Sequence, residues 1–251
     1  MRTLIIYLIL FANLWGMSAN LEGNTTDRLN SSLVTIIKIE GKVKILPASS
    51  IKKHTAVVDE LLFKGDKLIT YADSKVVVST SDNSKLVLNE NSELTFVDMQ
   101  KLEQESGEVY YNIQKRGHSK GLKIETPFSI IGIKGTEFIV DANETDGEIA
   151  LNEGLIGIES LQAEFELHKQ KVMAEYEAFK NKQMEEFEAY KAQGQDDVVT
   201  YVKAFDLQAS KILHFGDASS CEEDCESRVN ESDFTDKTAK RFESYQALIQ
   251  E

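Results

Sequence analysis

The two cysteines are the first candidates for chemistry in this chain. Cys221 and Cys225 enclose three acidic residues near the C-terminus. In an oxidising compartment, such a pair forms a disulfide within one chain or between two chains. Free redox-active thiols and a metal site are the alternatives, although His214 alone does not complete a set of soft ligands. We favour the disulfide and predict no metal site.

Residues for enzymatic catalysis form no recognisable set. The 4 histidines lie scattered at positions 54, 118, 168 and 214. The chain has no His-Glu-x-x-His pattern, no Gly-x-Ser-x-Gly pattern and no Walker-type loop. We therefore predict that the protein is not an enzyme and uses no cofactor.

Composition and charge narrow the function classes further. The chain has 251 residues, of which 41% are hydrophobic and 28% are charged, which fits one full globular domain plus a smaller unit. A polytopic membrane protein and a wholly disordered chain are excluded. The formal net charge of −14 argues against nucleic acid as a partner, because phosphate binding draws on clustered Lys and Arg.

The N-terminus has the order of a secretory signal. Arg2 precedes an apolar run over residues 4–14, and small residues follow at Ser18 and Ala19. The run is shorter than the roughly 20 apolar residues of a spanning helix. We expect a cleaved signal at 1–19, a polar linker at 20–32, a periplasmic or secreted protein and no integral membrane span after cleavage. An uncleaved anchor and a buried N-terminal helix are the alternatives.

Residues 33–160 alternate β-prone stretches with turn residues, and no helical period runs between them. The breaks are rich in Gly, Asn, Asp and Ser, which form tight turns. We predict an all-β domain with an antiparallel or solenoid-like sheet. The expected strands are residues 33–39, 43–46, 76–79, 85–88, 93–97, 108–113, 122–125, 136–141, 148–151 and 155–158.

Two segments of this region could contact a ligand. In residues 126–140, Pro127 fixes φ, and Gly132 and Gly135 permit a bulge or a close backbone approach. We interpret this segment as a bend between strand pairings, with a ligand loop as the alternative. The local basic cluster is interpreted as a solvated loop, with an anion or polymer contact as the alternative. Its members are Lys115, Arg116, His118, Lys120 and Lys123.

This region contains, in order, Gly41-Lys-Val, Gly65-Asp66, Thr126-Pro127 and Gly135-Thr136-Glu-Phe138. These ordered motifs resemble the FecR domain, named for the ferric-citrate regulator of bacterial cell envelopes. The resemblance covers about residues 36–158. One departure is Asp82-Asn83-Ser84 in place of Asp-Gly-Ser, a mild change because Asn tolerates the left-handed conformation. The motif residues, which we expect to be structural, are Gly41, Gly65, Asp66, Thr70, Thr126, Pro127, Gly135, Thr136 and Phe138.

This resemblance implies an all-β extracytoplasmic domain without a catalytic site. In the regulators of this family, a cytoplasmic anti-sigma segment and a membrane helix precede the β domain. Because only the short polar stretch 20–32 separates the expected cleavage site from the β region, we expect both segments to be missing here. The resemblance then implies an envelope-located binding or scaffold module.

After Ser160 a repeat of 11 residues begins, as Glu164–Lys169, Glu175–Lys180 and Glu186–Lys191. An 11-residue repeat keeps its apolar stripe on one face of a helix. Gly194 ends this helix, and apolar positions from Val198 to Ile212 predict a second one. We therefore predict a helical hairpin or coiled coil over 161–215. Its possible assembly face consists of Phe165, Tyr176, Phe179, Phe187 and Tyr190.

The hairpin either folds on the chain itself or mediates homo-oligomer or partner-helix contact. Residues 216–251 are expected to form an acidic tail with one short amphipathic helix that carries Phe242 and Tyr245. Taken together, these features predict a noncatalytic cell-envelope binding or scaffold protein with an envelope protein or wall polymer as partner. The alternative is an extracytoplasmic component of a FecR-type surface-signalling pathway that regulates a sigma factor.

Overall fold

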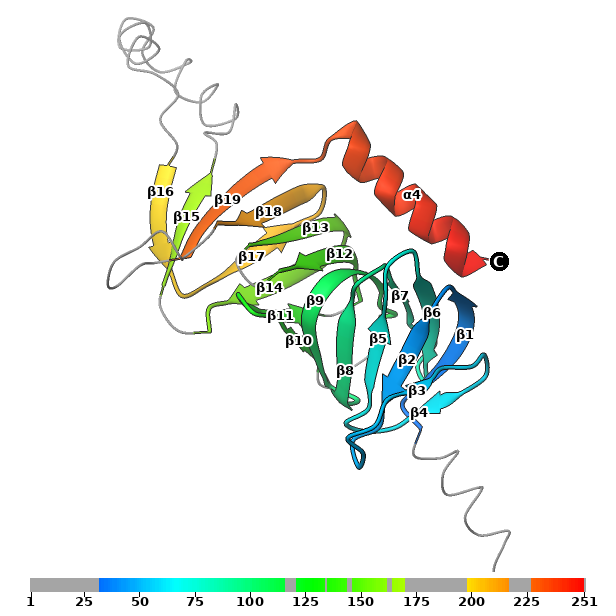
Figure 1. Cartoon of the computed structure of the whole chain (residues 1–251). Helices are drawn as coiled ribbons and strands as arrows, with labels where there is room; N and C mark the ends of the chain where they lie inside the picture. The colour runs from blue at the N-terminus through cyan, green and yellow to red at the C-terminus, as the bar shows by residue number, and fades with distance from the viewer. Residues whose placement is uncertain are drawn as a thin grey trace, which may run out of the picture. The chain divides into compact units, whose positions relative to one another are not determined.

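The computed structural model describes residues 32–115, 121–133, 135–143, 146–161, 164–169, 198–216 and 227–250. The chain divides into two units, Met1–Ser32 and Leu33–Glu251. The expected signal at 1–19 lies outside the described residues, as does the linker except for Ser32. The second unit is mostly β-sheet, with one helix in its described part (Figure 1).

The strands of this unit form two layers, and the first layer contains strands from the beginning and from the end of the unit's sequence. Its order is β4 (Leu61–Leu62), β1 (Val34–Glu40), β6 (Lys75–Thr80), β7 (Lys85–Leu88), β9 (Lys101–Asn112), β12 (Glu137–Ala142), β13 (Gly147–Glu153), β18 (Lys211–Phe215), β19 (Ser227–Asp233), β15 (Phe165–Lys169) and β16 (Val198–Val202). We call this layer sheet A. Its described pairs are antiparallel except for the parallel pair β15–β19.

A second layer, sheet B, shares β9 with the first. Its order is β3 (His54–Thr55), β2 (Val43–Leu46), β5 (Lys67–Thr70), β8 (Glu93–Asp98), β9, β10 (Leu122–Glu125), β11 (Ile130–Ile133), β14 (Leu155–Glu159) and β17 (Ala204–Gln208). The pair β9–β10 is parallel. Because β17 and β18 extend the two sheets next to β14 and β13, the residues after 160 continue the same fold.

Strand β9 passes from one sheet to the other. Its first half pairs with β8 and β10, and its second half pairs with β7 and β12 from Gly107 onward. Gly107 has a φ of 80°, a conformation that suits glycine because side chains with a Cβ are strained there. This one residue therefore lets a single 12-residue strand serve both layers.

The core lies between the inner faces of the two sheets. Along each strand, alternate side chains point inward, as in the burial pattern of β8. Val76, Val78 and Val109 of sheet A belong to one buried cluster with Leu68 and Ile124 of sheet B. The alternation in the sequence produces this arrangement, because successive side chains of a strand point to opposite faces.

The outer face of sheet A is covered by helix α4 (Asp236–Gln250). A second apolar cluster joins Tyr110, Ile139 and Ile212 of the sheet to Phe242 and Tyr245 of the helix. The backbone N–H of Thr238 donates to Thr235 Oγ1 at 3.3 Å, so Thr235 caps the helix. The tail helix expected from the sequence therefore forms and lies against the sheet (Figure 1), and its apolar side chains pack there.

The prediction of a helical hairpin over 161–215 is wrong at both of its ends. Residues 165–169 form β15, and residues 198–215 contain β16, β17 and β18. Phe165 and Leu167 are buried at alternate positions, and three of the five residues of Val198–Val202 are valines, which favour strands. The middle of the repeat, residues 170–197, lies outside the described residues.

Candidate functional site

The FecR-like motif residues Gly41 and Asp66 fix the backbone conformation of the first turns. Gly41 has a φ of 76°, and a Cβ at its position would lie 2.5 Å from Ser74 Oγ. The Lys42 N–H donates to that same oxygen at 2.8 Å. The carboxylate of Asp66 accepts the N–H of Ala48 at 3.0 Å and the N–H of Phe63 at 2.9 Å. These polar groups are used to fix turns, so they are not free for a ligand.

The motif threonines act in the same way. Thr70 Oγ1 donates to the Asn89 carbonyl at 2.5 Å and accepts the Ser92 N–H at 2.8 Å. Thr126 Oγ1 accepts the Ser129 N–H at 3.0 Å and so closes the turn that contains Pro127. Both hydroxyls replace backbone partners at sharp changes of direction.

The last motif lies where β11 leads into β12. Gly135 has a φ of 71°, and a Cβ there would meet Lys115 Cγ at 2.5 Å. Phe138 is fully buried and stacks on Tyr111 with ring centroids 4.8 Å apart. The hydroxyl of Thr136 is buried without a hydrogen-bond partner in the described part of the chain. The left-handed conformation of Gly135 therefore bends the chain between β11 and β12.

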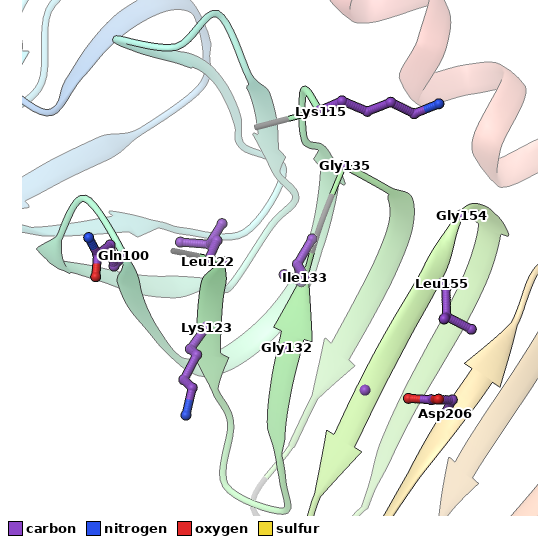
Figure 2. A pocket seen from close by; sticks show the side chains of 12 residues that line it. Gln100, Lys115, Leu122, Lys123, Gly132, Ile133, Gly135, Gly154, Leu155 and Asp206 are labelled. Atoms are coloured by element: carbon purple, nitrogen blue, oxygen red, sulfur yellow. The ribbon is translucent and has the colours of Figure 1, made fainter. Parts of the chain in front are cut away.

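A groove crosses the outer face of sheet B. Lys123, Gly132, Gly157 and Asp206 are register partners on four neighbouring strands, β10, β11, β14 and β17. The groove has a volume of about 820 Å³. Figure 2 shows Lys123 and Asp206 on opposite sides of Gly132. Leu155, which is 47% exposed, lines it as well.

At Gly132 and Gly157, which are register partners in this groove, the backbone does not require glycine. The nearest heavy atom to a Cβ at Gly132 would be the Gly157 carbonyl oxygen at 3.8 Å, and at Gly157 it would be Asp206 Oδ1 at 3.6 Å. Both are ordinary van der Waals distances. Gly132 pairs in regular register with both neighbours, so the expected bulge is absent at this residue. The glycines leave bare backbone as a floor between a cationic and an anionic side chain.

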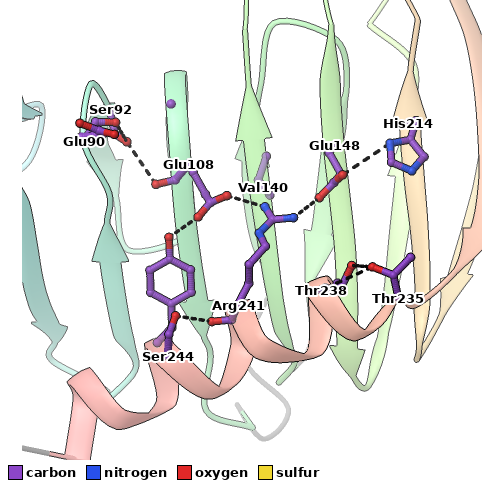
Figure 3. A network of polar contacts seen from close by, with 12 residues as sticks. Glu90, Ser92, Glu108, Val140, Glu148, His214, Thr235, Thr238, Arg241 and Ser244 are labelled. Carbon is purple, nitrogen blue, oxygen red and sulfur yellow. Dashed lines mark hydrogen bonds and ion pairs between the residues drawn. The ribbon is translucent and has the colours of Figure 1, made fainter. Parts of the chain in front are cut away.

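The second polar site lies on the outer face of sheet A. Glu108, Asp141, Glu148 and His214 are register partners on β9, β12, β13 and β18, and we call them the acidic row. Arg241 of α4 donates to both Glu108 and Glu148. Figure 3 shows its guanidinium between the two carboxylates, with Glu148 reaching on toward His214.

Aromatic and amide groups of α4 complete this contact. Tyr245 donates its hydroxyl to Glu108 and stacks on Tyr110 with ring centroids 5.2 Å apart. Gln246 donates to Glu137 Oε1 at 2.7 Å, and Tyr110 donates to the same oxygen at 2.7 Å. The helix is thus held by side chains of β9, β12 and β13.

Burial shifts the titration of several groups at this site. Burial raises the pKa of Asp141, and the neighbouring Glu108 carboxylate raises it further. Burial also raises the pKa of the Tyr245 hydroxyl, with the charge of Glu108 as the next cause. Burial alone would lower the pKa of Arg241, but its bond to Glu148 and the charge of Glu108 outweigh that effect and raise it. Arg241 therefore stays charged.

Neither site brings together a nucleophile with a base. Within the described ranges, no group of three or more His, Cys, Asp or Glu could hold a metal ion. His54 bonds Glu60 at 2.8 Å, and His214 faces Glu148 at 3.5 Å. In the same part of the chain, no helix is long and apolar enough to cross a membrane. What the two sites offer is charge and apolar surface for binding.

Other predicted site residues fall partly outside the described part of the chain. Cys221 and Cys225 lie outside the described residues, as do Tyr176, Phe179, Phe187 and Tyr190 of the possible assembly face. Phe165 of that face is buried in the main core. Of the basic cluster, Lys115 and Lys123 line the groove of sheet B, whereas Arg116, His118 and Lys120 lie outside the described residues.

Sequence reasoning missed the groove and the acidic row, since both depend on strand register. One signal was present for the groove: the pattern Ile-Gly-Ile occurs at residues 131–133 and again at 156–158, which places a glycine between two inward-facing residues. No comparable signal marks Arg241, because its partners Glu108 and Glu148 lie 133 and 93 positions earlier in the chain.

Comparison with known proteins finds a matching family model and solved structures that are similar to part of the chain. Two crystal structures of a candidate anti-sigma factor from Parabacteroides distasonis align with 69% of this chain at 9% identity, with TM-scores of 0.46 and 0.45. The chain spans 62% of the length of those proteins. No curated protein matches the chain. Residues 66–157 match the model of the family described as FecR protein. These residues run from the Asp66 turn to the glycine floor of the groove, and this part of the chain is therefore similar to the FecR family.

Proposed function

We propose that this protein is an extracytoplasmic regulatory component of a FecR-type surface-signalling pathway. The match of residues 66–157 to the FecR family carries the proposal. This segment includes β9 and the groove-forming strands β10 and β11, so it lies at the centre of the described fold. The periplasm or the cell exterior, as expected from the N-terminal sequence, is the proposed location.

A noncatalytic mode of action fits the chemistry of the described residues. The hydroxyl and carboxylate groups of Thr70 and Asp66 bond the backbone of turns. The guanidinium of Arg241 is held in ion pairs with Glu108 and Glu148. Side chains bonded in this way hold the fold in place, so they are not available to transfer protons to a substrate. We therefore propose that the protein acts by binding other envelope components and that it needs no cofactor.

The groove of sheet B is the proposed contact surface for this role. It offers an exposed cation at Lys123, an exposed anion at Asp206 and apolar surface at Leu155. Protein interfaces combine such an apolar centre with polar residues at the rim. The competing function is a scaffold that binds wall polymer. The two functions differ in the partner that the protein binds.

The test is capture of partners by the full chain from solubilised envelopes. The baits are wild type, Lys123→Glu/Asp206→Lys and, as a matched control, Lys64→Glu/Glu243→Lys, which reverses two exposed charges outside the groove. We expect wild type and control to retain the same membrane regulator or receptor, and the groove variant to retain much less of it. Retention of wall polymer alone, or equal retention by all three baits, would contradict the proposal.

A further inference from the structure

The acidic row places like charges side by side. Glu108, Asp141 and Glu148 are direct register partners on three adjacent strands, where Cβ atoms of opposed residues lie about 4.5–5.5 Å apart. Like charges at this spacing repel. Arg241 is the cation that α4 brings to them, and it bonds the two outer carboxylates. The row therefore presents three carboxylates to one guanidinium.

Beside the acidic row lies an apolar row on the same face of sheet A. Val87, Tyr110, Ile139, Ala150 and Ile212 are register partners across β7, β9, β12, β13 and β18, and all are buried under α4. The rings of Phe242 and Tyr110 pack edge-on with their centroids 6.2 Å apart, and the ring of Tyr245 stacks on the ring of Tyr110. The sheet thus offers an apolar strip bordered by an anionic strip.

The face of α4 matches both strips. Tyr245 lies four residues after Arg241 and three residues after Phe242, so both of these side chains neighbour it on one side of the helix. The cation meets the acidic row, and the two aromatic rings meet the apolar row. This is the pattern of an amphipathic helix bound to a groove, except that the helix and its receptor belong to one chain.

We propose that α4 is a displaceable latch over a docking surface for a basic amphipathic helix of a partner protein. The partner helix carries a cation in the place of Arg241 and aromatic residues in the places of Phe242 and Tyr245. Charge complementarity selects this occupant, because α4 supplies one cation to three carboxylates and a helix with further cations is attracted more strongly.

The position of α4 suits such an exchange. It is the last described element of the chain, and it follows β19 after only Phe234 and Thr235, so it can leave without breaking a strand pair. Its other charged neighbours on the sheet are Glu137 of β12, which bonds Gln246, and His214 of β18, which faces Glu148. The inference does not rest on the proposed signalling role.

The test uses the full chain and a fluorescent peptide with the sequence of residues 234–250 as the probe. The chains are wild type, Arg241→Glu and, as a matched control, Lys240→Glu, which changes the neighbouring but exposed cation. Hydrogen exchange reports whether α4 is docked, and fluorescence anisotropy reports peptide binding. We expect Arg241→Glu to release α4 and to bind the peptide at least about tenfold more tightly than wild type and the control do.

A second peptide with Arg241→Glu is expected not to bind, while a peptide with Gln246→Lys is expected to bind more tightly than the natural sequence. Hydrogen exchange of the β9 and β12 amides shows whether each chain is folded. If the Arg241→Glu chain is not folded, Arg241→Gln is used in its place. The proposal is overturned if α4 stays protected in both Arg241 variants. It is also overturned if the released chains bind the Arg and Glu peptides equally, or bind neither.

Discussion

Gly107 of β9 lies so close to Ser92 that a Cβ on the glycine would be 2.3 Å from the serine Oγ. The same serine donates its hydroxyl to the Glu108 carbonyl at 3.1 Å. This contact fixes the point where β9 leaves sheet B and enters sheet A. The next residue, Glu108, begins the acidic row under α4. A tight backbone contact therefore sets the position of a charged surface.

Replacement of Gly107, where β9 changes sheets, and of Gly157, in the groove of sheet B, is predicted to change the free energy of unfolding in opposite directions. Gly107→Ala adds left-handed strain and a clash, so it should lower the free energy of unfolding by about 2–4 kcal/mol. A Cβ at Gly157 would lie at an ordinary van der Waals distance of 3.6 Å from Asp206 Oδ1, so Gly157→Ala should raise the free energy of unfolding by about 0.4–1 kcal/mol, because the unfolded chain loses freedom. Urea unfolding of both variants measures this, and equal changes would contradict the packing described for Gly107.

Asp141→Asn is predicted to stabilise the protein at neutral pH. The pKa of Asp141 is raised in the folded state by burial and then by Glu108, so its ionisation costs folding free energy as the pH rises through that raised value. Below its ordinary value of 3.8, both chains carry a neutral side chain and the gain should vanish. Thermal melts of Asp141→Asn and of Asp206→Asn, an exposed control, measure the effect. A gain that persists below that pH would disagree with this assignment.

The two buried motif threonines are predicted to respond differently to loss of the hydroxyl. Thr70→Val leaves the Ser92 N–H without its acceptor and should cost about 1–3 kcal/mol of unfolding free energy. Thr136→Val removes a hydroxyl that has no partner among the described residues and should be neutral or stabilising. Guanidinium titrations compare the pair. A comparable loss in both variants would mean that the Thr136 hydroxyl is bonded.

Asp66→Asn is predicted to destabilise the turn before β5. The carboxylate accepts two N–H groups, and an amide offers only one oxygen, so one donor loses its partner at a cost of about 1–3 kcal/mol. Asp73→Asn is the control, because Asp73 is exposed with a φ of 53° that Asn tolerates. A melting temperature unchanged in Asp66→Asn would show that the carboxylate does not hold this turn.

The sequence allowed the β region to be located because its signal is local. Alternating apolar residues and turn residues predicted strands at β1, β2, β6, β7 and β8, and the structure has them there. Asn83, which replaces the glycine of the family turn, has a φ of 62° as Asn permits. Short strands such as β3 and β4 were missed, because two residues carry no periodic pattern.

The regions after residue 160 show where local patterns mislead. Phe165 and His168 fit a helical spacing, but Phe165 and Leu167 also alternate, and pairing with β16 and β19 decides for a strand. The acidic row could not be predicted, since the charged residues that meet there come from four strands and one helix. Strand register and helix docking are tertiary properties that no single segment encodes.

The central claim, a regulatory role in FecR-type signalling, is tested most directly by transcript profiles in the organism that encodes the chain. The comparison is between wild-type cells, cells that lack the gene and cells complemented with the natural chain. We predict that transcripts of a defined group of genes change on deletion and return on complementation. Unchanged transcripts together with altered wall composition or cell shape would contradict the claim and favour an envelope scaffold.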